Sequence, residues 1–153
     1  MTFIPKGYKI PQEVETDLFL LRPITIHDVI KDHDAVITSQ EHLWNRFGEK
    51  WGWPSPDLSL EQDLIDLAWH QKEAQIQSSF TYSVMSSDQN LQLGCVYVDP
   101  PSVNETDAEV WFWVRTSMLE SGFASKLEEF VRKWLKTEWP FNVVNLNDEV
   151  VEL

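Results

Sequence analysis

The feature that most constrains the fold is the stretch "AEVWFWVRTSMLESGFASKL", in which an apolar strand leads through a short loop into a helix. The strand is predicted over residues 108–115, and the helix opens on Gly122. Apolar residues repeat at helical spacing on one side of this helix, and most of its basic residues lie on the other side. A helix start of this kind can hold an anion, because its first N–H groups have no partner within the helix.

The remaining pattern predicts an α/β fold with a mixed, largely antiparallel central sheet flanked by helices. Turn-forming "SSDQN" and "PPSVNETD" separate three successive strands, which favours antiparallel neighbours. Strands are expected at 18–23, 80–85, 91–99, 108–115 and 141–146, and helices at 25–37, 59–77 and from 122 onward. The aromatic residues between 42 and 58, among glycines and prolines, predict a structured loop or short helical turns that either lines a pocket or covers the core.

Length and composition favour one domain over residues 1–153, with residues 1–16 as an extended N-terminal arm. At 153 residues and 42% hydrophobic content, the chain can close one core more easily than two. On the second helix, a stripe of apolar residues is expected to face this core, formed by Leu60, Leu64, Leu67 and Ala68.

The net charge of -13 disfavours nucleic acid and anionic membranes as partners. A solvated acidic surface is the favoured interpretation of this charge, and attraction of a cationic or amine substrate is the alternative. The single cysteine, Cys95, excludes an intrachain disulfide and reads as a small buried residue. The four histidines lack the spacing of a zinc site, so no metal is expected, and the absence of an apolar leader at the start of the chain predicts a cytoplasmic protein.

The segments "LRPITIHD", "LGCVYVDPP" and "AEVWFWVR" occur in an order that resembles GNAT-type N-acetyltransferases. The resemblance covers roughly residues 17–146. The segments "GCVYVDPP", "AEVWFWVR" and "WLKTEWPF" are similar to a bacterial branch of that superfamily, although this chain is short at its C-terminus. The resemblance implies acetyl-CoA as co-substrate and an amine as acceptor.

In that superfamily the central strand diverges from its neighbour and binds the pantetheine arm through main-chain groups. The corresponding residues here are Phe112, Trp113, Val114 and Arg115. The family loop Gln/Arg-x-x-Gly-x-Gly/Ala falls on residues 119–124, where the Gly-x-Ala end matches and the leading Gln/Arg is replaced by leucine. The predicted pyrophosphate site is therefore made by Ser121, Gly122, Phe123 and Ala124.

Two features of this loop leave its role open. Glu120 carries a negative charge that opposes a pyrophosphate, and Ser121 with Gly122 is also a plausible plain helix cap. Arg115 is a candidate for a phosphate contact or, equally, for an ion pair with a carboxylate.

Glu109 is the candidate general base for acetyl transfer. By the two-residue period of a strand it shares a face with Trp111 and Trp113, whose indoles make its surroundings less polar. An ordinary strand-end carboxylate is the alternative. No tyrosine occupies the place of the family's general acid, which leaves this role to water, another residue or the second subunit of a homodimer.

Two functions follow. The first is an acyl-CoA-dependent N-acetyltransferase acting on an amine of a small molecule or peptide. The second is a non-catalytic GNAT-like domain that binds a ligand or a partner, which the replaced Gln/Arg and Glu120 favour.

Overall fold

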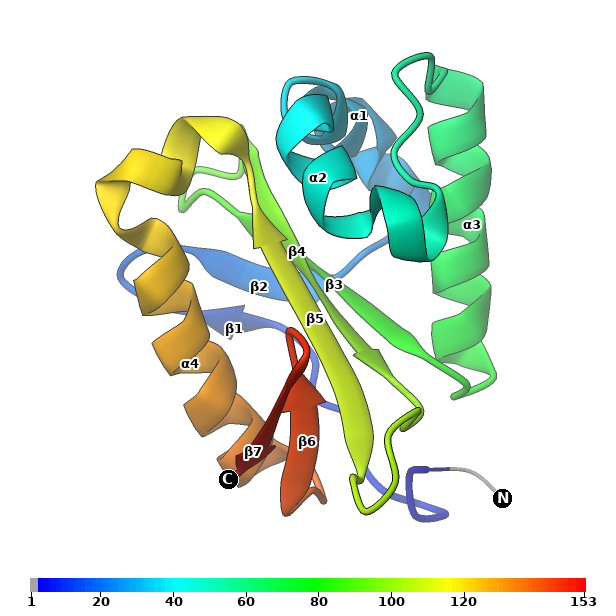
Figure 1. Ribbon diagram of the computed structural model, residues 1–153, viewed down its shortest axis with the longest axis vertical. Coiled ribbons are helices and arrows are strands. Elements are labelled where there is room, and N and C mark those ends of the chain that lie inside the picture. Colours follow the sequence, from blue (N-terminus) through cyan, green and yellow to red (C-terminus); the bar gives the residue numbers. More distant parts are fainter. Residues whose placement is uncertain (1–2) are drawn as a thin grey trace.

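The computed structural model describes residues 3–153, so residues 1 and 2 of the predicted arm lie outside the described part. The chain forms one seven-stranded sheet with helices on both faces (Figure 1). In chain order the elements are β1 (Val14–Glu15), β2 (Leu20–Pro23), η1 (Ile26–Asp28), α1 (Val29–Ile37), α2 (Gln40–Trp51), α3 (Leu60–Gln75), β3 (Phe80–Met85), β4 (Gln92–Asp99), β5 (Ala108–Val114), η2 (Thr116–Ser121), α4 (Phe123–Glu138), β6 (Val143–Leu146) and β7 (Glu149–Glu152). Among these residues, no helix is both long enough and apolar enough to cross a membrane.

The strands lie in the sheet in their order along the chain, from β1 to β7. Every neighbouring pair is antiparallel except β5 with β6, which are parallel. A parallel pair needs a long crossover, and α4 supplies it. The predicted mixed, largely antiparallel sheet flanked by helices is confirmed.

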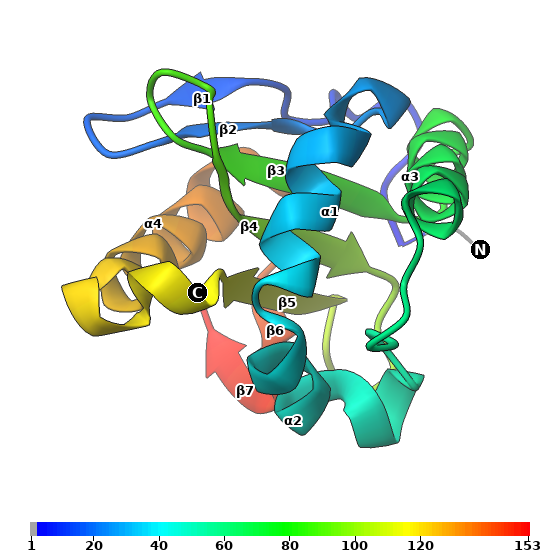
Figure 2. The ribbon, with the colours of Figure 1, turned by 90° about the horizontal axis from the view of Figure 1, so that it is seen from above.

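Helices α1, α2 and α3 cover one face of the sheet, and α4 covers the other (Figures 1 and 2). Along β5, Val110 and Phe112 belong to the core cluster that includes Leu127 of α4, whereas Trp111 and Trp113 belong to a second cluster under α1 and α2. Burial on both faces explains why β5 reads as an unbroken apolar run rather than an alternating one.

The structure corrects the expected elements at two places. Much of the aromatic stretch predicted as loop or short turns is the regular helix α2, which ends at Gly52 with a left-handed φ of 61°. The acidic C-terminus forms the additional strand β7, which the sequence pattern did not predict. Its turn is made by Asn147 and Asp148, both with positive φ, so a hairpin forms without glycine.

Candidate functional site

Strands β5 and β6 separate after a short paired region. They pair from Ala108 with Val144 to Val110 with Leu146, after which β6 turns into β7 while β5 continues to Val114. Beyond Val110, one edge of β5 therefore has no neighbouring strand among residues 3–153. Past this divergence, β5 continues into the loop that leads into α4 (Figure 1).

The main-chain groups of β5 alternate between β4 and this edge. Arg115 donates its N–H to Leu93 on the β4 side, so Trp113 and Arg115 face β4 while Phe112 and Val114 face the edge. Four residues were predicted to lie along the pantetheine arm. Of these, only Phe112 and Val114 present their main-chain groups to the divergence.

The edge at Phe112 is already covered by side chains of the protein. The N–H of Phe112 donates to Asn147 Oδ1 at 3.1 Å, and its carbonyl accepts from Arg46 Nη1 at 3.0 Å. Arg46 and Asn147 also bond to each other at 3.3 Å. One helix and one turn therefore satisfy both main-chain groups of this residue.

His42, from the same face of α2 as Arg46, lies against the main chain of Val114. Burial and the charge of Arg46 lower the pKa of His42, so its ring favours the neutral form. Its Nε2 is buried and has no hydrogen-bond partner in the described part of the chain.

The predicted anion-binding loop has the expected glycine and helix start. Gly122 has a φ of 78°, and a Cβ at this position would meet nothing within 4 Å, so the backbone conformation rather than space favours glycine. The Ser121 hydroxyl accepts from Phe123 N–H, as in a helix cap. The first helical bond runs from Lys126 to Gly122, and among residues 3–153 the N–H groups of 124 and 125 have no hydrogen-bond partner. These open donors suit a phosphate.

Arg115 points away from that loop. Its guanidinium donates to Asp34 Oδ2 at 3.1 Å, to Thr38 Oγ1 and to the carbonyl of Gln92. Of the two roles left open by the sequence, the structure shows the ion pair with a carboxylate. The arginine thus links the end of β5 to α1 through hydrogen bonds and does not face the predicted phosphate site.

Glu109 lies in the last paired segment before β5 and β6 diverge. It is 9% exposed, accepts from the Ser102 hydroxyl, and has Asn145 Nδ2 at 3.5 Å from Oε1. As expected from the strand period, it shares a face with Trp111. Its cross-strand neighbour on that face is Asp99 of β4.

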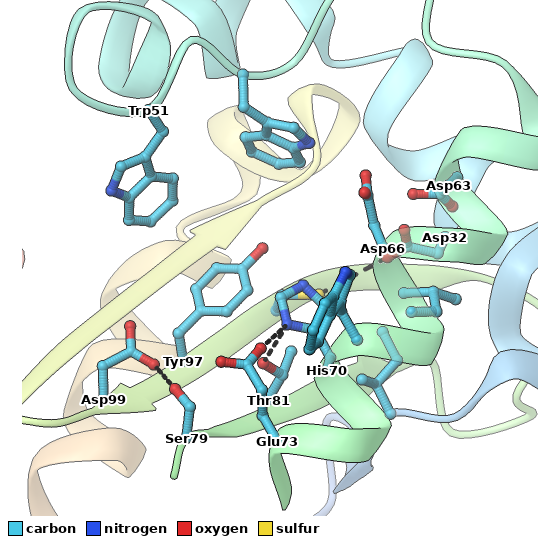
Figure 3. A pocket seen from close by; sticks show the side chains of 15 residues that line it. Asp32, Trp51, Asp63, Asp66, His70, Glu73, Ser79, Thr81, Tyr97 and Asp99 are labelled. Atoms are coloured by element: carbon cyan, nitrogen blue, oxygen red, sulfur yellow. Dashed lines mark hydrogen bonds and ion pairs between the residues drawn. The ribbon is translucent and has the colours of Figure 1, made fainter.

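That same face of the sheet forms the floor of a cavity of about 440 Å³, roofed by α3 (Figure 3). This volume is in the range of pockets that hold small organic ligands. Its aromatic walls include Trp51, Trp53 and Tyr97, so the aromatic stretch does line a pocket. Its acidic residues are Asp32, Asp63, Asp66, Glu73 and Asp99.

Helix α3 turns its charged side toward the sheet. Asp63, Asp66, His70 and Glu73 follow helical spacing and line the cavity. The prediction that the apolar stripe of this helix faces the core is largely wrong. Only Leu67 of the stripe is buried, whereas Leu64 is 40% exposed. Acidic residues also recur at helical spacing in this sequence. Because an apolar stripe does so as well, the sequence did not show which of the two sides faces the sheet.

At the inner end of the cavity, neither Asp32 nor Asp63 forms an ion pair with another residue of 3–153. Asp63 is 2% exposed, and its Oδ2 has no hydrogen-bond partner within residues 3–153. Burial, the neighbouring Asp32 and the charge of Asp66 raise the pKa of Asp63 to about 9. Burial also raises the pKa of Asp32, although Gln92 donates a hydrogen bond to it.

At the outer end, burial raises the pKa of Asp99, and the Ser79 hydroxyl opposes this by donating to the carboxylate. Glu73 and Glu109 raise this pKa further through their charges. Within residues 3–153, no group of three or more His, Cys, Asp or Glu side chains is arranged to hold a metal ion.

A largely antiparallel sheet whose parallel pair diverges beside a glycine-opened helix defines an acetyltransferase-type fold. The acetyltransferase (GNAT) domain family matches residues 19–148, and the chain belongs to this family. The domain is accordingly of the N-acetyltransferase class.

Solved structures share this fold at low sequence identity. Ribosomal-protein-S5-alanine acetyltransferase from Vibrio fischeri is 12% identical with a TM-score of 0.68, over 88% of this chain and 72% of that one. RimL, a ribosomal L7/L12 α-N-protein acetyltransferase in complex with coenzyme A, is 16% identical with a TM-score of 0.66, over 87% and 72%. The GNAT domain of S. lividans PAT is 18% identical with a TM-score of 0.58, over 89% and 79%. None of the curated proteins compared with the chain matches it.

Proposed function

We propose that the protein is an acyl-CoA-dependent N-acetyltransferase that acts on an amine. The observation that carries this proposal is the divergence of β5 from β6, which lies between the open N–H groups at the start of α4 and the carboxylate of Glu109. Family membership and the coenzyme A complex of RimL support acetyl-CoA as the co-substrate. We also propose that the protein works in the cytoplasm, as its single cysteine suggests.

Each part of this site has a distinct task in the proposal. At the helix start that follows Ser121 and Gly122, the open N–H groups of Ala124 and residue 125 would hold the pyrophosphate. The main chain of Val114 with His42 Nε2 would contact the pantetheine arm. Acetyl-CoA supplies an activated acetyl thioester. The acceptor nitrogen forms a bond to the acetyl carbon, the C–S bond breaks, and the proton lost by the amine passes to Glu109 and then, through water, to the thiolate of coenzyme A.

The second candidate, a non-catalytic GNAT-like binding domain, is favoured by the covered edge of β5. Because Asn147 and Arg46 already satisfy Phe112, a pantetheine arm must displace them to pair with this residue. Glu120 lies in the loop as an exposed carboxylate and repels phosphate there. A domain of this kind would bind a ligand in the acidic cavity without transferring an acetyl group.

The acceptor class is also part of the proposal. Two of the similar structures carry names that refer to ribosomal proteins, which favours a peptide amine. The cavity over β4 favours a small cation, because its walls are carboxylates and aromatic rings. We give the cavity more weight, since it belongs to this chain.

Calorimetric titration with acetyl-CoA, followed by a thiol-release assay over a panel of small amines and N-terminal peptides, tests the two candidates together. Binding with turnover on any amine establishes the enzyme. Binding of amines without thiol release supports the non-catalytic domain. Turnover that is unchanged in a Gly122→Val protein would contradict the proposed cofactor site.

A further inference from the structure

The inward side of α3 is unusual for a helix that covers a sheet. It directs Asp63, Asp66 and Glu73 toward the strands while Leu64 and Ile65 remain exposed. Burying the Asp63 carboxyl without an ion pair costs free energy, and its Oδ2 lacks any hydrogen bond within the described residues. Glu73 is less buried and has His70 Nδ1 at 3.7 Å. The cavity therefore has the chemistry of a cation site whose cation is not part of the protein.

We propose that this cavity binds a linear aliphatic polyamine, with one ammonium group beside Asp63 and Asp66 and another beside Glu73 and Asp99. Figure 3 shows Asp63 and Asp66 on one side of the cavity, Asp99 on the opposite side, and Tyr97 and His70 between them. Asp63 and Glu73 are ten residues apart on one helix, which at about 1.5 Å per residue separates them by roughly 15 Å. Carboxylates on two opposite sides of the cavity suit a ligand with charges at both ends.

The walls between the two acidic ends favour an organic chain over a hydrated metal ion. Trp51 stands edge-on to Tyr97 with ring centroids 5.8 Å apart, and both line the cavity. Aromatic faces attract ammonium groups and pack against methylene groups, whereas a metal ion requires several oxygen ligands around one point. Such a cluster is absent from residues 3–153.

The position of the outer end connects the cavity with the proposed reaction. Asp99 is the cross-strand neighbour of Glu109, so an amine held at Asp99 lies near the candidate base. Resting on the proposed function, the polyamine is then the acceptor: its outer ammonium first loses one proton to solvent, and the neutral amine is acetylated by the transfer described above. Its inner ammonium, beside Asp63, remains charged and fixes the orientation of the chain.

Calorimetric titration with spermidine, and separately with butylamine, measures whether both ends are used. Spermidine is expected to bind at least about tenfold more tightly than butylamine, because it engages both acidic ends. In the free protein Asp63 holds a proton, which the bound ammonium displaces, and asparagine cannot ionise in this way. Asp63→Asn and Asp99→Asn are each expected to weaken spermidine binding by about tenfold or more.

Glu61→Gln is the matched control, because Glu61 is an exposed carboxylate on the same helix and its change removes the same charge. It should leave spermidine affinity within about twofold. Equal weakening in Glu61→Gln and Asp63→Asn would overturn the site and show general attraction by the acidic surface. Equal affinity for spermidine and butylamine would overturn it as well. Far-UV circular dichroism of each variant establishes that the fold is retained.

A thiol-release assay with acetyl-CoA separates this inference from the proposed function. If spermidine binds in the manner described and is not acetylated, the cavity stands as a polyamine site and the acetyltransferase proposal fails for it. If another amine is acetylated at rates that Asp63→Asn and Asp99→Asn leave unchanged, the enzyme stands and the polyamine inference is overturned.

Discussion

The covered edge of β5 and the acidic cavity over β4 lie on neighbouring strands, yet they are built in opposite ways. At the edge, Asn147 and Arg46 satisfy the main-chain groups of Phe112 within the protein. In the cavity, Asp63 has a buried oxygen to which no group of residues 3–153 forms a hydrogen bond. The protein thus closes its strand edge by itself but leaves its cavity short of positive charge. A ligand must compete with the protein's own hydrogen bonds at the strand edge, whereas the cavity offers it an unused acceptor.

The largest effect is expected where the two regions meet, at Glu109. Glu109→Gln should lower turnover by about 10²-fold or more while affinity for coenzyme A stays unchanged, because the amide cannot take the amine's proton. Steady-state thiol release and coenzyme A titration measure the two quantities. Glu105→Gln, an exposed carboxylate in the loop before β5, is the control. Turnover equal to that of the parent would remove Glu109 from the chemistry.

Gly122→Val should weaken coenzyme A binding by more than about tenfold, because valine strains the left-handed φ and disturbs the N–H groups at the start of α4. Gly7→Val is a matched control, since Gly7 has a φ of 80° and equally open surroundings in the N-terminal arm. Calorimetry measures the affinity, and thermal unfolding compares the strain. A similar loss of affinity in both variants would show that stability, not the loop, is responsible.

Removing the side chain that covers the strand edge should strengthen cofactor binding. Asn147→Gly frees the N–H of Phe112 and keeps the positive φ of the turn. Affinity for coenzyme A should then rise about threefold to fivefold, which corresponds to the net free energy of one hydrogen bond. Asp148→Gly changes the other residue of the turn, and removes only an exposed ion pair with Lys50. If Asn147→Gly binds more weakly than the parent, the asparagine contacts the cofactor instead of blocking it.

Asp63 should make the protein less stable as the pH rises. Its pKa is about 9 in the folded protein and about 3.9 in an unfolded chain, so between these values the folded state holds a proton that the unfolded state has lost. Its contribution is fully present below about pH 4 and is lost as the pH rises toward 9. Asp63→Asn removes this term and should unfold a few degrees higher than the parent at pH 8 and at nearly the same temperature at pH 4.

Thermal unfolding across this pH range measures the difference between the two proteins. Asp32 faces Asp63 and also has a raised pKa, so part of the decline should remain in the variant. Parallel stability curves for parent and variant would show that Asp63 is already ionised in the folded protein.

The elements that the sequence predicted best are those whose local signals and burial agree. Strand β3 and the strand leading to Gly122 were placed to within a residue, because apolar runs bounded by turn residues are local features. Strand β7 was not predicted, since it has four residues and its turn uses Asn147 and Asp148 without glycine. Pairing with β6 stabilises it, and that partner is not visible in its own sequence.

The candidate site shows the same division. The sequence singled out Gly122 and Glu109, because a glycine before an amphipathic helix and a carboxylate on an apolar strand are local features of the sequence. Their roles remain predictions. The covering of Phe112 by Arg46 joins residues 66 positions apart. No periodicity connects such positions, so the closed edge of β5 could not be predicted.

By itself, the sequence determined that the chain forms a mixed sheet with a strand, a glycine and a helix start suited to an anion, because these depend on spacing and conformational preference along the chain. Only the tertiary structure decided which side of α3 faces inward. An apolar stripe and an acidic stripe run along this helix, and packing placed Asp63 and its acidic neighbours over β4. Direction in space is set by the partners of a helix, and for α3 those partners come from β3, β4 and α1.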